Sequence, residues 1–193
     1  MSSKLQAKWD ARYTERTRPP DPSPVLADYA HLLPAQGRAL DLACGLGANA
    51  LFLAQRGLET LAWDISPVAV ERVRGFASER GVRIDAAVRD VVDAPPPRGA
   101  FDVIVVSHFL ERGVAPRLID AMRDRGLLFY QTFVREQVSG AGPSNPSYRL
   151  GENELLALFG SLRILLYREE GMVGDVSAGL RDVAQLVGQK RAP

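Results

Sequence analysis

Short apolar runs alternate with segments of helical periodicity along most of the chain. The apolar runs lie at 39–43, 59–63, 83–88, 101–106 and 127–133, and the helical segments lie at 48–56, 67–80 and 115–125. Runs that are apolar at nearly every position are typical of parallel strands covered by helices on both faces. The pattern therefore predicts an α/β fold with a doubly wound, mostly parallel sheet.

Two helices are predicted before the first strand, and strand character returns at the end of the chain. The first helix contains Trp9 and Tyr13. Ser23 followed by Pro24 is typical of an N-cap with a proline in the first turn, which predicts a second helix running towards Leu33 and ending before Pro34. Beyond a loop at 134–151, the pattern predicts a short helix at 152–159 and strands at 163–168 and 181–188.

Composition narrows the class of protein. A chain of 193 residues with 46% hydrophobic residues suits one globular domain spanning 1–193. Its 24 Lys and Arg balance 23 Asp and Glu, so no global field favours a nucleic-acid or membrane partner. Cys44 is the only cysteine, residues 1–10 lack the apolar run of a signal peptide, and no apolar stretch is long enough to span a membrane. A cytoplasmic location is expected.

Polar and glycine residues follow three of the predicted strands. The run Asp41-Leu42-Ala43-Cys44-Gly45-Leu46-Gly47 lies where the first strand turns into a helix, the crevice in which open α/β sheets bind ligands. Asp64 ends the second strand and is placed to accept bonds from ribose hydroxyls. Asp90 follows the third strand, where it and the Val91 N–H suit an adenine ring. Together these positions predict a nucleoside-shaped site.

A dinucleotide site is an alternative interpretation of the same loop. Gly45 to Ala50 also matches the Gly-x-Gly-x-x-Ala fingerprint, with Asp64 at a suitable distance beyond it. The acidic Asp41 before the glycines, and a chain with little room for a separate substrate domain, oppose a nicotinamide-dependent reductase.

The order of these motifs resembles that of the class I S-adenosylmethionine-dependent methyltransferases. The resemblance rests on Asp41-x-Ala43-x-Gly45-x-Gly47, Asp64, Arg89-Asp90-Val91, and Phe101-Asp102-Val103-Ile104 leading to Ser107-His108-Phe109-Leu110. Trp9-Asp10-x-Arg12-Tyr13, Ala62-Trp63-Asp64 and Glu152-Asn153-Glu154-Leu155 are similar to motifs of the tellurite-resistance and thiopurine methyltransferase branch. Ala48 and Asn49 stand where related sequences often carry an arginine, which weakens any oxyanion specificity that rests on it.

This resemblance implies a Rossmann-like sheet of seven strands with an antiparallel last strand, and S-adenosylmethionine as cofactor. Residues 1–36 would form helices that cap the cofactor site, and 37–193 the α/β core. The implied cofactor contacts are Trp9, Arg12, Tyr13, Asp41, Ala43, Gly45, Gly47, Asp64, Ile65, Asp90, Val91 and Ser107. No metal cluster is expected, because two histidines and one cysteine form no recognisable ligand pattern.

The chemistry that follows is methyl transfer to a small molecule. A sulfonium is already a strong electrophile, so a soft nucleophile such as a thiolate or a selenium or tellurium oxyanion needs no base. An alcohol or amine acceptor would need one, and His108 after the fourth strand is the candidate, with a role in shaping the pocket wall as its alternative. We expect a soft nucleophile; O- or N-methylation and a non-catalytic cofactor-binding module are the alternatives.

A few further residues are considered for structural or acceptor-binding roles. Cys44 is expected to pack under the cofactor, and Arg149, in a loop that could form a substrate lid, is expected to be exposed. Only one of Tyr130 and Gln131 can face the acceptor, because neighbouring strand residues point to opposite faces. Asn145-Pro146-Ser147-Tyr148 resembles a motif of enzymes that methylate amide or base nitrogens, but it does not follow the fourth strand as that motif does. A nucleic-acid substrate is therefore not expected.

Overall fold

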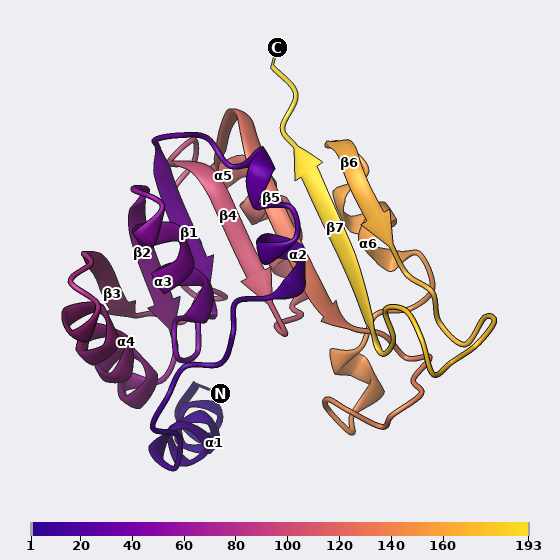
Figure 1. Ribbon diagram of the computed structural model, residues 1–193, viewed down its shortest axis with the longest axis horizontal. Coiled ribbons are helices and arrows are strands. Elements are labelled where there is room, and N and C mark those ends of the chain that lie inside the picture. The colour runs from indigo at the N-terminus through magenta and orange to yellow at the C-terminus, as the bar shows by residue number, and fades with distance from the viewer. Residues whose placement is uncertain (1, 193) are drawn as a thin grey trace.

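The computed structural model describes residues 2–192 and shows a seven-stranded sheet in the order β3-β2-β1-β4-β5-β7-β6 (Figure 1). The strands are β1 (Arg38–Leu42), β2 (Glu59–Asp64), β3 (Ile84–Val88), β4 (Phe101–Ser107), β5 (Met122–Phe133), β6 (Arg163–Arg168) and β7 (Val183–Gln189). The α-helices are α1 (Ser2–Thr14), α2 (Pro24–Ala27), α3 (Ala48–Gln55), α4 (Pro67–Glu79), α5 (Ala115–Ala121) and α6 (Glu154–Phe159), with 3-10 turns η1 (Ala30–Leu32), η2 (Arg112–Val114) and η3 (Pro146–Tyr148). β7 runs opposite to the other strands of the sheet, so the predicted α/β fold class is confirmed.

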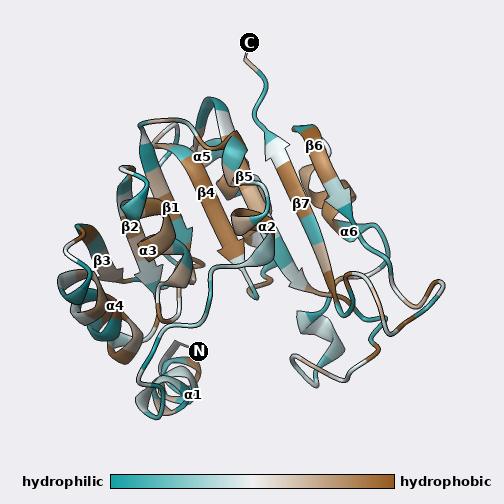
Figure 2. Ribbon diagram, viewed as in Figure 1, coloured by the Kyte–Doolittle hydropathy of each residue, from teal (hydrophilic) through white to brown (hydrophobic). Residues whose placement is uncertain are grey.

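Helices cover both faces of the sheet. In Figure 1, α2 and α3 lie in front of it and α5 and α6 behind. Val103 and Val105 of β4 pack in a core cluster with residues of α2 and α3, whereas Ile104 and Val106 pack in the cluster that includes α5 and α6. Because β4 is buried on both faces, it is apolar along nearly its whole length, as Figure 2 shows.

The parallel strands β1, β2 and β4 all end at one edge, the lower edge in Figure 1. Helix α1 lies below this edge, and the segment 134–151 lies beside it. Within residues 2–192, no helix combines the length and the apolar character needed to cross a membrane.

The second helix is much shorter than predicted. Pro24 begins α2, but α2 ends at Ala27 and the chain continues through η1 rather than as helix to Leu33. The hydroxyl of Ser23 does not cap the helix; it donates to Asn49 Oδ1 at 3.0 Å. The irregular path lets Tyr29 and Leu33 pack on the core cluster under α2, so tertiary contacts override the helical pattern.

The boundary between α5 and β5 also differs from the prediction, which continued the helix to Arg125. Helix α5 ends at Ala121, and β5 already begins at Met122, which pairs with Phe101 of β4. The ladder then shifts before Leu127 pairs with Val103. A bulge with Arg125 at φ +64° absorbs the extra residues, which no helical or strand period can reveal.

Arg149 was expected at the surface and is instead only 3% exposed. Its guanidinium donates to the carbonyls of Val134 at 3.0 Å, Pro143 at 2.7 Å and Ala141 at 2.6 Å. Asp182, the residue before β7, holds the same segment by accepting from the backbone N–H and the hydroxyl of Ser139. The segment 134–151 is therefore an ordered loop built around a buried cation.

Replacing Arg149 with methionine should destabilise the protein by about 3 kcal/mol, since three carbonyls, one of them buried, would lose their charged donor while the aliphatic stem is kept. Urea unfolding followed by circular dichroism measures this change. Tyr148→Phe is the matched control: the neighbouring side chain is 51% exposed, and its loss of a hydroxyl should cost less than about 0.5 kcal/mol. Equal effects of the two substitutions would contradict a structural role for Arg149.

Candidate cofactor-binding and active site

The loop after β1 turns sharply at the carboxyl edge of the sheet. Ala43, Gly45 and Gly47 all have positive φ, at 55°, 52° and 74°. A Cβ at Gly47 would lie 2.7 Å from a methyl carbon of Val73 on α4, so the loop needs glycine there for its close packing. The N–H of Cys44 donates to the carbonyl of Trp63 at 3.0 Å, which ties the loop to the end of β2.

Asp41 is buried beneath this loop. Its Oδ2 accepts from the N–H of Ala50 at 3.0 Å, and its Oδ1 lies 3.5 Å from the amide nitrogen of Asn49. Asn49 in turn accepts from the backbone N–H and the hydroxyl of Ser23. Asp41 thus anchors the first turn of α3, and burial raises its pKa to about 7.

Asp64 lies at the end of β2 and joins two turns. Its Oδ2 accepts from the N–H of Gly45 at 2.8 Å, and its Oδ1 accepts from the N–H of Ser66 at 2.9 Å. Burial raises the pKa of Asp64, and the nearby charge of Asp10 raises it further. The Ser66 hydroxyl accepts from Ala69 N–H at 3.2 Å and so caps α4. The carboxylate of Asp64 is therefore fixed beside the glycine loop.

Helix α1 packs against this arrangement. A Cβ at Gly45 would lie 3.0 Å from the Tyr13 hydroxyl oxygen, so Tyr13 lies directly over the loop. Trp9 stacks on Tyr13 with ring centroids 5.7 Å apart. Asp10 accepts a hydrogen bond from the Ser66 hydroxyl, a link that sequence reasoning missed although Asp10 belongs to the quoted N-terminal motif. The contacts of Tyr13 and Asp10, three residues apart on α1, thus hold the helix over the ends of β1 and β2.

The turn after β3 carries Asp90 and Val91. Asp90 Oδ1 accepts from Val92 N–H at 3.1 Å, which makes Asp90 the first residue of a tight turn. Val91 is buried in the core. The guanidinium carbon of Arg89 lies 4.0 Å from the ring centroid of Trp63, so the turn is pinned onto β2. Ile65, half-buried, lies between the end of β2 and the start of α4 in the chain.

The end of β4 presents Ser107 and His108. The imidazole Nδ1 lies 3.0 Å from the Ser107 hydroxyl oxygen, and the ring centroid lies 4.9 Å from that of Phe133. His108 is exposed at the surface, but the protein atoms packed around it lower the pKa of its imidazole, and the positive charge of Arg12 lowers it further. His108 has φ +56°, a conformation that few side chains adopt. A neutral imidazole is therefore favoured at the edge of the sheet.

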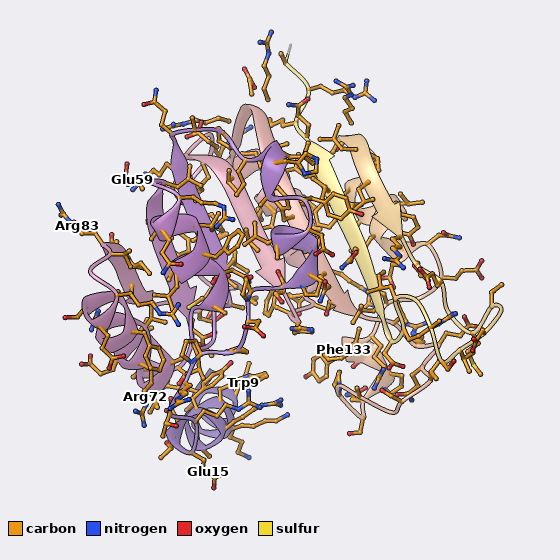
Figure 3. The ribbon with its side chains drawn as sticks, viewed as in Figure 1. Trp9, Glu15, Glu59, Arg72, Arg83 and Phe133 are labelled. Atoms are coloured by element: carbon orange, nitrogen blue, oxygen red, sulfur yellow. The ribbon has the colours of Figure 1, made fainter. Side chains whose placement is uncertain are left out.

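Phe133 is a second residue that sequence reasoning missed, although it ends the predicted fifth strand. Figure 3 shows Phe133 at the end of β5 and Trp9 on α1, both below the end of β4 and on either side of it. Tyr130 and Gln131, the residues considered earlier, are both buried and internally bonded. The Tyr130 hydroxyl donates to the Phe109 carbonyl at 2.8 Å, and Gln131 Oε1 accepts from Gln185 at 2.8 Å. Phe133 is thus the aromatic residue that β5 presents.

Two other residues considered from the sequence, Cys44 and Asn145, have structural contacts within the protein. Cys44 packs beside a small core cluster, and burial raises the pKa of its thiol well above the ordinary value. Asn145 caps η3 by accepting from Ser147 N–H at 2.9 Å. Residues 2–192 contain no group of three metal-ligating side chains.

Residues 39–125 match the family described as methyltransferase domain. The structure of TehB from Haemophilus influenzae superposes with a TM-score of 0.74 at 19% identity and covers 95% of this chain and 67% of TehB. A SAM-dependent methyltransferase from Methanosarcina mazei gives a TM-score of 0.69 at 16% identity, with 90% and 100% covered. The chain has the fold of the class I methyltransferases. The resemblance drawn from the sequence motifs is thereby confirmed, and the methyltransferase match spans the glycine loop, Asp64, Asp90 and His108.

Curated proteins that are similar to this chain match it over part of their own length. The ubiquinone biosynthesis O-methyltransferase of Xanthomonas axonopodis pv. citri is 33% identical over 121 residues, which are 58% of this chain and 51% of the relative. The 2-heptyl-1-hydroxyquinolin-4(1H)-one methyltransferase of Mycobacteroides abscessus is 30% identical over 118 residues, with 55% and 52% covered. The chain spans about half the length of these relatives.

The raised pKa of Asp41 predicts a pH dependence of stability. The unfolded chain has an Asp pKa near ~3.9, below the folded value of about 7, so the folded state holds the proton more tightly. The resulting stability is fully present below about pH 4 and is lost as the pH rises through about 7. Asp41→Asn cannot titrate, so the free energy of unfolding of the wild type relative to this variant should fall over that range.

Urea unfolding of both proteins at a series of pH values tests this prediction. Asp85→Asn, at an exposed position of β3, is the control and should leave the pH profile of the wild type unchanged. A difference between wild type and Asp41→Asn that stays constant with pH would contradict it.

Proposed function

We propose that this chain binds S-adenosylmethionine and transfers its methyl group to a small-molecule acceptor. The observation that carries the proposal is the gathering of the glycine loop, Asp64, Asp90 and His108 at the ends of β1, β2, β3 and β4, the crevice where α/β sheets bind ligands. The match to the methyltransferase domain family and relatives named as O-methyltransferases support it.

The residues at this edge fit the parts of the cofactor. Each carboxylate oxygen of Asp64 accepts one backbone hydrogen bond, which leaves acceptor capacity for two ribose hydroxyls. Asp90 and the Val91 N–H suit the adenine edge. The glycine loop leads into the N-terminus of α3, which favours a carboxylate. When bound, S-adenosylmethionine would supply an electrophilic methyl group on a sulfonium.

Tyr13 and Trp9 would complete the enclosure. Because Tyr13 lies directly over Gly45, α1 shares its space with any ligand of the loop. We infer that α1 is displaced to admit the cofactor and then packs over it, which would exclude water from the reacting groups.

Calorimetric titration tests the cofactor site. The wild type should bind S-adenosylmethionine and its demethylated product, and Asp64→Ala should weaken both by at least tenfold, about 1.4 kcal/mol, because the ribose hydroxyls lose a charged acceptor. Asp85→Ala removes an exposed carboxylate from the neighbouring strand β3 and should bind as the wild type does. Tight binding of a nicotinamide dinucleotide by a wild type that ignores S-adenosylmethionine would replace this proposal with a reductase.

The acceptor class depends on whether a base is needed. A thiolate or a selenium or tellurium oxyanion needs none, and this soft acceptor is our first proposal. Relatives that are named as O-methyltransferases support a hydroxyl acceptor as the second. His108 distinguishes the two, because its lowered pKa keeps the imidazole neutral and able to take a proton.

His108→Asn is the variant of choice, since asparagine tolerates the positive φ at this position and cannot act as a base. With a hydroxyl acceptor, kcat should fall by a factor of about 10² or more while the affinity for S-adenosylmethionine is kept. With a thiolate acceptor, kcat should change by less than about threefold. An unimpaired variant on hydroxyl acceptors would remove His108 as the base.

We also propose a cytoplasmic enzyme without nucleic-acid or membrane partners. The near balance of 24 basic and 23 acidic residues and the single cysteine support this setting.

A further inference from the structure

Arg12 is a cation without an ion-pair partner among residues 2–192, at the edge where the proposed reaction takes place. Arg12 is exposed on α1, close to Asp10 and Tyr13, which contact the body of the protein. Tyr13 faces the glycine loop and Asp10 bonds Ser66, which fixes the rotation of the helix. Arg12 therefore projects from the flank of α1 rather than into the loop.

The flank of α1 that carries Arg12 also carries Trp9, which lies below the end of β4 (Figure 3). The guanidinium carbon of Arg12 lies 5.4 Å from the ring centroid of Trp9, a cation–π contact that holds the side chain in place. Arg12 is also the charged residue whose field reaches His108. His108 in turn packs against Phe133. Arg12 thus contacts Trp9 on one side of the end of β4, and His108 contacts Phe133 on the other side.

The charge pattern of α1 gives an independent reason to expect an anion here. Lys4, Lys8 and Arg12 follow one another at four-residue spacing, and like charges at this spacing destabilise a helix. All three are exposed and have no ion-pair partner within the described chain. An anionic ligand at the Arg12 end would offset this repulsion.

We propose that Arg12 is the specificity-determining residue on the acceptor side of the site, and that the acceptor carries an anionic group beside an apolar body. The guanidinium would pair with the anion, since its fork matches a carboxylate or similar oxyanion. Trp9 and Phe133 would contact the apolar body. Arg12 then acts on the acceptor, not on the cofactor as the family resemblance implies.

This inference rests on the proposed methyltransferase function, and the test separates the two. Cyclohexanecarboxylate and cyclohexanecarboxamide share one shape and differ in charge, and neither absorbs where tryptophan is excited. Each is titrated into the protein saturated with S-adenosylhomocysteine, and binding is followed by the fluorescence of Trp9. Trp63, the other tryptophan, is 4% exposed and serves as a constant background.

The wild type should bind the carboxylate at least tenfold more tightly than the amide. Arg12→Gln should abolish this preference while changing the affinity for S-adenosylhomocysteine by less than twofold. Lys8→Gln, an equal loss of charge one turn earlier on the same helix, should preserve the preference.

Several results would overturn the inference. The first is a wild type that does not bind the carboxylate or does not prefer it to the amide. The second is an equal loss of preference in Lys8→Gln, which would indicate a diffuse field of the whole helix. The third is a tenfold loss of S-adenosylhomocysteine affinity in Arg12→Gln, which would make Arg12 a cofactor contact. If the wild type does not bind S-adenosylhomocysteine at all, the proposed function itself fails. If it binds and shows no preference for the carboxylate, only the inference fails.

Discussion

The carboxylate of Asp64 holds together the part of the molecule on which the site depends. One oxygen accepts from Gly45 in the loop after β1, and the other accepts from Ser66 at the start of α4. Ser66 also donates to Asp10, so one group of hydrogen bonds links the loop after β1, the end of β2, the start of α4, and α1. A buried carboxylate is stable only when hydrogen bonds replace the water it has lost. The geometry of the glycine loop and the docking of α1 are therefore coupled through this group.

Much of this arrangement could be predicted because it is local in the sequence. The carboxyl ends of parallel strands meet at one edge, so an acidic residue after each strand indicates a shared site even without knowledge of the strand order. The Ser66 cap needs only the residues that follow it. The position of Asp64 and Asp90 at one edge of the sheet could be predicted in this way, from the residues that follow each strand.

Features that depend on distant partners could not be predicted in the same way. Ser23 looks like a helix cap until Asn49, 26 residues further on, takes its hydroxyl. Arg149 looks like a surface residue because arginine usually is one, and only the carbonyls that fold around it explain its burial. The role of Asp10 could not be predicted for the same reason, because its hydrogen-bond partner Ser66 lies 56 residues further along the chain.

The distribution of charged residues illustrates why the net charge of a whole chain says little about the charge at one site. A net charge of +1 argues against steering by the whole molecule, yet it averages the basic flank of α1 with acidic groups elsewhere. Exposed charges are screened beyond about 10 Å at ~0.1 M salt, so a ligand responds to the charges that lie close to it and not to the mean over the chain. Since the docking of Tyr13 and Asp10 fixes which side of α1 meets the carboxyl edge of the sheet, the contacts that position the helix also set the local charge at the acceptor side. In this chain the selectivity for an acceptor and the closure over a cofactor would then depend on the same helix.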